Sequence, residues 1–268
     1  NPTGPADPII VHPDVRRMLL TQKSIAEGGR ALIGYLAQLV DISHVEQEAA
    51  KKADSEATLA LLIPIAKAFL TEIGLECTSH GIQILGGHGF IKEWGMEQLM
   101  RDTKISCIYE GTTGIQALDL LARKILGSKG EIMQPFTSEV ASFCQANTAD
   151  EAMAEFITPI MTFANQWQKM TQTIGAKAMQ NPDEIGAASV DYLMYSGYVT
   201  LAYFWAKMAK VAQDKLAVSD DEKDFYQAKI KTARFYFQRI LPRAHGHASC
   251  LENGADAMMD LDAAHFIF

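Results

Sequence analysis

Helical periodicity runs through almost the whole chain and constrains its fold more than any other feature. Apolar residues recur about every 3.6 positions between Val15 and Leu39, and similar patterns return in most later segments. Runs of β-branched and aromatic residues with a period of two, which strands require, are missing. The sequence therefore predicts an all-α fold.

Glycine, proline and cap residues divide this pattern into separate helices. The first is expected from Asp14 into the polar run 46–55, with Pro13 in its first turn. A second is expected over about 59–84, where Pro64 lies in the first turn or kinks the helix. Ser219 to Glu222 resembles a capping box that starts a late helix. The remaining helices are expected near 96–107, 114–126, 150–180, 182–217 and 220–241, followed by a weaker one.

The turn at 127–130, with the sequence GSKG, is the best candidate for a domain boundary. Its position predicts two helical domains, one over 1–130 and one over 131–268. The chain begins with Asn and not Met, so we expect a fragment or a processed product.

Composition excludes several classes of function. The 268 residues carry a net charge of -8, whereas a general nucleic-acid binder is expected to be basic. The cysteines form no CxxC pair. His245 and His247 are two residues apart and so face different sides of a helix, and no Cys or acid is placed to complete a site with them, so no metal site is predicted. No unbroken apolar run approaches the roughly 18 residues of a membrane helix, and no signal peptide is present. We expect a cytoplasmic protein that does not enter a membrane.

One break between helices, IYEGTTGIQ at 108–116, carries an acidic residue, Glu110. Beside the apolar residues Ile108 and Tyr109, this carboxylate could be desolvated and become a usable base. The alternative is that Glu110 only complements a helix dipole at the surface. Spacing alone favours this alternative.

The residues after Glu110 suit the start of a helix. Thr113 with Gln116 three positions later forms a capping-box pattern, and Thr112 is the competing cap. Either cap leaves backbone N–H groups at the helix start that favour oxygen ligands. Gly111 allows a ligand to approach the backbone closely.

A second break, GIQILGGHGF at 81–90, matches neither the dinucleotide-binding GxGxxG pattern nor a phosphate-binding P-loop. Together with MEQLMRDTKI and IYEGTTGIQ, however, it resembles the C-terminal domain of the acyl-CoA dehydrogenase flavoproteins, an up-down helical bundle. The order and spacing of the motifs agree over about 11–128. The rest of the chain resembles the additional helical domain of longer bacterial members of that family.

The resemblance implies a role for Glu110. It corresponds to the glutamate that removes the α-proton of an acyl-CoA thioester, while the β-hydrogen passes as hydride to FAD. The N–H groups of Glu110 and Gly111 correspond to donors that hold the thioester carbonyl. Tyr109, Gly111 and Trp94 are the expected substrate-binding residues, although Trp94 is equally explained as a tryptophan packed in a turn.

The resemblance also implies the cofactor contacts. The flavin is expected beside Thr112, Thr113 and Gly114. The adenosine diphosphate half of FAD, bound in a neighbouring subunit, is expected beside Gln83, Ile84, Leu85, Gly86 and Gly87. A homo-oligomer, dimer or tetramer, follows from this arrangement. The sequence differs from the family pattern at two positions: Gly114 and Pro13 stand where many members carry glutamine. Each difference removes one side-chain contact with FAD that those members make.

A complete member of the family would also carry an N-terminal helical domain and a middle β-domain. We therefore expect the 268-residue chain alone to be inactive. An electron-transfer flavoprotein is the expected electron acceptor, with oxygen as the alternative. The alternative hypothesis is that the chain belongs to a non-catalytic relative with a structural or DNA-binding role. The net charge argues against DNA, although lysines and arginines in 229–243 form a small basic patch.

Overall fold

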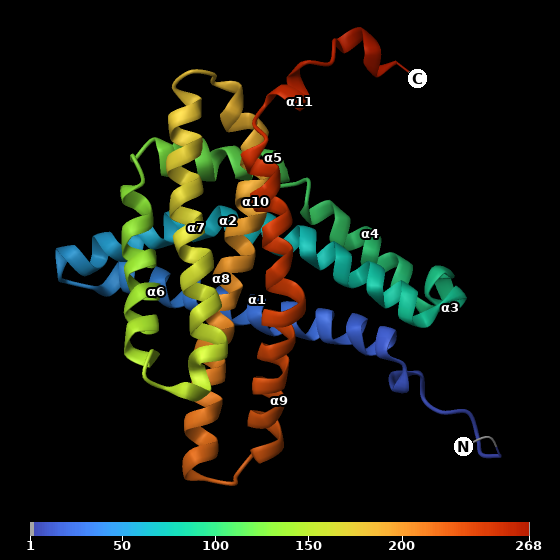
Figure 1. Cartoon of the computed structure of the whole chain (residues 1–268). Coiled ribbons are helices and arrows are strands. Elements are labelled where there is room, and N and C mark those ends of the chain that lie inside the picture. The colour runs from blue at the N-terminus through green and yellow to red at the C-terminus, as the bar shows by residue number, and fades with distance from the viewer. Residues whose placement is uncertain (1–2, 268) are drawn as a thin grey trace.

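The computed structural model describes residues 3–267 and shows an all-α fold (Figure 1), as the periodicity predicts. Within this range every regular element is a helix. The two longest helices of the first half, α1 (Pro13–Val45) and α2 (Ala49–Leu85), are joined by a short loop and lie side by side. The other elements of this half are η1 (Ile9–Val11), α3 (Gly87–Phe90), η2 (Lys92–Trp94), α4 (Met96–Ser106), α5 (Thr113–Leu118) and the π-helix η3 (Asp119–Leu126).

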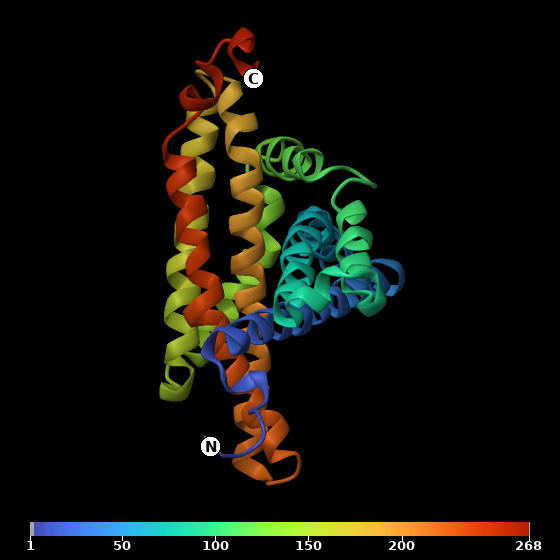
Figure 2. The ribbon, with the colours of Figure 1, turned by 90° about the vertical axis from the view of Figure 1, so that its right-hand side faces the viewer.

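The helices of the second half run crosswise to α1 and α2 (Figures 1 and 2). Its central helix, α8 (Asp183–Val218), contacts α7, α9 and α10 as well as both long helices of the first half. The other elements are η4 (Glu131–Met133), α6 (Gln134–Asn147), η5 (Glu151–Met153), α7 (Ala154–Ala178), α9 (Lys223–Phe235), the π-helix η6 (Tyr236–Ile240), η7 (Leu241–Arg243), α10 (Ala244–Glu252), α11 (Asp256–Met259) and η8 (Ala263–Phe266).

Two helix starts differ from the sequence expectation. α2 begins at Ala49, so Pro64 lies inside the helix; the polar run before residue 59 is rich in Ala, Lys and Glu, which are strong helix formers. α9 begins at Lys223 without the expected capping box. The Ser219 hydroxyl accepts from the N–H of Asp221 instead (2.9 Å), and Glu222 adopts a left-handed conformation that delays the helix. The periodicity also does not single out α6.

Close contacts with α8 join the two halves. The indole Nε1 of Trp205 donates to the carbonyl of Ser24 on α1 (3.0 Å), and its ring lies against Gly28. Nearer the start of α8, Gly197 lies directly against the ring of Phe69 on α2. Buried residues of both halves form one hydrophobic core. The turn at 127–130 does separate η3 from η4, but the domain division at residue 130 stays a prediction because this core is continuous.

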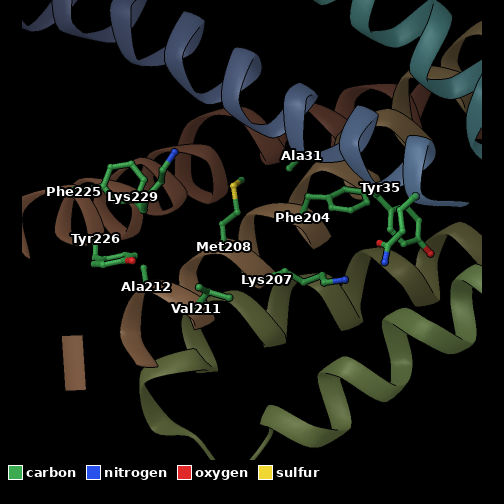
Figure 3. A pocket seen from close by; sticks show the side chains of 11 residues that line it. Ala31, Tyr35, Phe204, Lys207, Met208, Val211, Ala212, Phe225, Tyr226 and Lys229 are labelled. Atoms are coloured by element: carbon green, nitrogen blue, oxygen red, sulfur yellow. The ribbon is translucent and has the colours of Figure 1, made fainter. Parts of the chain in front are cut away.

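A polar network lies beside this core. The Glu139 carboxylate on α6 accepts from the hydroxyls of Tyr35 on α1 and Tyr203 on α8, the latter at 2.6 Å. Burial, with a contribution from Glu139, raises the pKa of both tyrosines, so these hydroxyls remain donors. Next to the network, α1, α8 and α9 form an open pocket of about 400 Å³, lined in part by Tyr35, Phe204 and Lys207 (Figure 3). None of the predicted site residues lines this pocket.

By length and composition alone, α2 is apolar enough to cross a membrane, with a mean hydropathy of 1.7 over an 18-residue window. No unbroken apolar run of this length was expected from the sequence. The window of α2 passes because it allows up to two charged residues among the apolar ones. Half of the window is buried inside the protein, where Leu61, Leu62 and Ile65 belong to the core. A core helix passes the same test, so α2 is weak evidence for a membrane segment.

We predict that Gly197→Ala destabilises the protein. A Cβ at this position would lie 2.2 Å from Cγ of Phe69, which is fully buried and has no room to move. Overpacking of this kind costs about 1–3 kcal/mol. The measurement is the free energy of unfolding in urea. Gly186→Ala, on the same helix with no atom within 4 Å of the added Cβ, is the control and should stabilise by about 0.5–1 kcal/mol. Similar effects of both substitutions would contradict the packing argument.

Candidate functional site

The break that carries Glu110 has an uncommon backbone conformation. After α4 ends at Ser106, the chain turns, and both Glu110 (φ 55°) and Gly111 (φ 93°) lie in the left-handed region. Glycine adopts this region freely, whereas a glutamate there is conformationally costly. The structure thus keeps an acidic residue at a position whose backbone favours glycine.

Side chains hold both carbonyl groups of this break. The Glu110 carbonyl accepts from Nε2 of Gln116 (2.9 Å), and the Gly111 carbonyl accepts from Nζ of Lys67. Next to them, the Thr113 hydroxyl donates to Oε1 of Glu72. Lys67 and Glu72 both belong to α2, so the break is tied to the core helix.

The backbone N–H groups of Glu110 and Gly111 are in the opposite situation. Within residues 3–267, neither of them donates a hydrogen bond. Two adjacent donors are therefore available to a ligand beside the Glu110 side chain. Such a pair of free N–H groups can hold a carbonyl oxygen on which negative charge develops.

Side-chain hydrogen bonds show which of the two threonines caps α5. Oγ1 of Thr112 accepts from the N–H of Ile115 (3.4 Å), so Thr112 is the N-cap. The capping box of Thr113 and Gln116 is not formed. Thr113 uses its hydroxyl on Glu72, and Gln116 reaches back to the carbonyl of Glu110.

The expected desolvation of Glu110 is not supplied by this chain. Glu110 is exposed, and Ile108 and Tyr109 are each 52% exposed. Burial of the carboxylate therefore requires a surface beyond the described residues. The turn leaves all three residues of 108–110 exposed, so the apolar neighbours in sequence do not shield the carboxylate.

The second break starts where α2 ends, at the left-handed Gly86 (φ 59°). Gln83, Ile84 and Leu85 form the last turn of α2, and Gly87 begins the single turn of α3. A Cβ on Gly86, Gly87 or Gly114 would meet no atom within 4 Å, so the backbone is open to a ligand at these positions.

Trp94, the remaining predicted substrate residue, packs edge-to-face on His88 with ring centroids 5.0 Å apart, yet it is 56% exposed. Its contact with His88 agrees with packing in a turn. Its exposed part leaves room for a further partner.

The structure places the two predicted cofactor segments apart. The Thr113–Glu72 contact sets the first residues of α5 beside the middle of α2. Gln83 follows Glu72 by eleven residues in the same helix. At 1.5 Å per residue this separation is about 16 Å. One compact group therefore cannot touch both segments, whereas an extended group, or two bound copies of it, can.

Large apolar side chains are exposed over the same region. Between residues 85 and 118 their exposed fractions range from 38% to 76%. Exposed apolar surface of this kind marks an interaction site. The residues are Leu85, Phe90, Ile91, Trp94, Leu99, Ile105, Ile108, Tyr109, Ile115 and Leu118.

Periodicity and motifs do not point to Lys67 and Glu72. The available signal is that Lys67 interrupts the apolar stretch 61–70, where Ala66 and Ala68 on either side are buried. A charged group inside such a stretch must find a partner. The sequence does not show that the partner is the Gly111 carbonyl.

Other clusters of polar residues have structural partners. Nδ1 of His247 lies 2.7 Å from the carboxylate of Asp191, and the His245 ring packs at a tilt against Phe163, with ring centroids 4.6 Å apart. Burial raises the pKa of the Cys77 thiol to about 12, which keeps it protonated. All four cysteines are free. Within residues 3–267, no group of three or more His, Cys, Asp or Glu side chains could hold a metal ion.

Comparison with known proteins places the chain in a family. A profile described as "Acyl-CoA dehydrogenase, C-terminal domain" matches residues 3–126, and one described as "Acetyl-CoA dehydrogenase C-terminal like" matches residues 136–262. The chain therefore belongs to the acyl-CoA dehydrogenase family, of which it represents the C-terminal helical region.

Among individual proteins, the chain is similar to 3-methylmercaptopropionyl-CoA dehydrogenase of Ruegeria pomeroyi, with 36% identity over 95% of this chain and 43% of the relative. Butyryl-CoA dehydrogenase of Syntrophomonas wolfei is 33% identical over 100% of this chain and 44% of the relative. The chain thus spans less than half the length of these proteins. The crystal structure of Caenorhabditis elegans ACDH-11 in complex with C11-CoA shares the fold, with 22% identity and a TM-score of 0.66, covering 81% of this chain and 34% of that one.

We predict that the left-handed conformation of Glu110 is costly for any residue with a Cβ. Glu110→Gly should therefore be more stable than Glu110→Ala by about 1 kcal/mol. Urea unfolding of both variants measures the difference. At Glu97, a helical position in α4, the order of the same two substitutions should reverse, because alanine favours helices over glycine. If Glu110→Ala proves as stable as Glu110→Gly, the turn carries no strain.

Proposed function

We propose that this chain is the C-terminal part of an FAD-dependent acyl-CoA dehydrogenase in which Glu110 is the catalytic base. The observation that carries the proposal is the geometry of the break. An acidic side chain in a costly backbone conformation stands beside two free N–H groups, in a chain of this family. Among the relatives, the ACDH-11 structure is described as a complex with C11-CoA, which supports an acyl-CoA as the substrate class.

In the proposed reaction, the Glu110 carboxylate takes the proton from the α-carbon of the thioester. The C–H electron pair forms the new α,β double bond as the β-hydrogen leaves with its electron pair. FAD, when bound, supplies the acceptor for that hydride. The free N–H groups of Glu110 and Gly111 donate to the thioester carbonyl, which gains negative charge as the α-proton leaves. The product is a trans-2-enoyl-CoA.

The residues of this chain fit two contacts with such a cofactor. Thr112, Thr113 and Gly114 open α5, where free N–H groups favour oxygen atoms. The backbone of Gly86 and Gly87 is open to a ligand about 16 Å along α2 from Glu72. This separation supports the arrangement in which Gln83–Gly87 reaches FAD bound by a second subunit of a homo-oligomer.

The proposed site is completed by other protein surface. Glu110 is exposed here, and apolar side chains are exposed throughout 85–118. In the proposed enzyme, the domains that precede this region in the relatives, or a second subunit, cover that surface and exclude water from the carboxylate. We further propose an electron-transfer flavoprotein as the electron acceptor.

We predict that Glu110→Gln abolishes reduction of the flavin by acyl-CoA while FAD stays bound. An amide of the same size cannot accept the α-proton, and loss of a general base costs about 10²- to 10⁴-fold in rate. The measurement is anaerobic bleaching of the flavin in the holoenzyme, with Glu131→Gln, at an exposed residue of η4, as the control. Bleaching at the normal rate by the Glu110 variant would show that Glu110 is not the base.

We also predict that the isolated 268-residue chain neither retains FAD nor oxidises acyl-CoA, since its cofactor contacts are exposed and widely spaced. The purified chain would be mixed with FAD, desalted and examined by visible absorption. A yellow chain that turns over substrate would contradict this prediction.

A further inference from the structure

Two charged side chains of α2, those of Lys67 and Glu72, form hydrogen bonds with the Glu110 break. Within residues 3–267, neither Lys67 nor Glu72 forms an ion pair; their side-chain hydrogen bonds go to Gly111 and Thr113. Lys67 also stands between the buried residues Ala66 and Ala68. Removing a charged side chain from water costs free energy unless hydrogen bonds compensate, and the compensating bonds of Lys67 and Glu72 go to the Glu110 break.

The hydrogen bonds to these two carbonyl groups also fix the direction of the N–H groups that follow them, those of Gly111 and Thr112. In a trans peptide, the C=O of one residue and the N–H of the next point in opposite directions. By holding the Glu110 carbonyl, Gln116 directs the Gly111 N–H away from itself. Lys67 holds the next peptide plane through the Gly111 carbonyl, which fixes Gly111 from its other side and directs the N–H of Thr112.

Gly111 is required for this arrangement. A Cβ at this position would lie 2.9 Å from Nε2 of Gln116, and φ is 93°. The glycine thus lets the Gln116 amide approach the carbonyl beside Glu110. The Gly111 N–H and the backbone that carries the Glu110 side chain are thus set by the peptide plane that Gln116 holds.

We propose that Lys67 and Gln116 are positioning residues for the reaction. They hold the peptide planes around Glu110 so that its carboxylate and the Gly111 N–H meet the α-carbon and the carbonyl of one thioester. Glu72 supports them by fixing the start of α5 through Thr113. This inference rests on the function proposed above, because it assigns these residues to the chemistry of Glu110.

The test uses Lys67→Met and Gln116→Met in the holoenzyme. Both remove a donor to a carbonyl while keeping an unbranched side chain. A misplacement of about 1 Å costs up to about 10²-fold in rate, so kcat should fall about 10- to 100-fold with little change in KM. Exchange of the substrate α-proton with deuterated solvent should fall by the same factor. Lys67→Arg, which retains a donor, should restore most of both rates.

The control is Lys169→Met, at an exposed lysine on α7 remote from the break, which should leave kcat and exchange unchanged. FAD content and melting temperature identify a variant that fails to fold. If Lys67→Met fails in this way, Gln116→Met decides the test, because the hydrogen bond that it removes is exposed. If both methionine variants keep the normal kcat while Glu110→Gln is inactive, the positioning role is wrong and the proposed function stands. If Glu110→Gln itself reduces flavin normally, both are wrong.

Discussion

The contact of α8 with α1 and α2 is the interaction on which the other features depend. Gly197 allows Phe69 of α2 to pack directly on the α8 backbone, and Trp205 donates to a carbonyl of α1 across the same surface. Phe69 lies two residues from Lys67 and three from Glu72, the side chains that hold the Glu110 break. The core contact therefore fixes the part of α2 that supports the candidate site. The second half of the chain also contacts the site region directly, because α8 packs against α5.

The sequence predicts the fold class well because burial against several neighbours produces a strong helical period. It fails at particular starts for local reasons. The Ala- and Lys-rich run before Leu59 is polar yet helical, so α2 begins earlier than expected. At Ser219–Glu222 the left-handed Glu222 replaces a capping box, and single-residue backbone conformations of this kind leave no periodic signal.

The site was predictable to the level of the motif and no further. Glu110 and Gly111 lie at a break, as expected, and the comparisons support the family from which the role of Glu110 comes. Whether Glu110 is the base is left to experiment. Lys67 and Glu72 were not predictable, since their contacts join residues more than 40 positions apart. The expectation of a desolvated Glu110 failed because the apolar neighbours in sequence are exposed with it.

The continuous α2 helix also has a consequence for how this region can vary. Glu72 and Gln83 belong to one unbroken helix, so their spacing and their relative direction are both fixed by the helical screw. Insertion of one residue between them would rotate one end by about 100° against the other and lengthen the separation by about 1.5 Å. The stretch 72–83 therefore fixes both the distance and the relative orientation of the two groups of contacts. Its residues can be exchanged, but their number cannot change without moving one group of contacts out of register with the other.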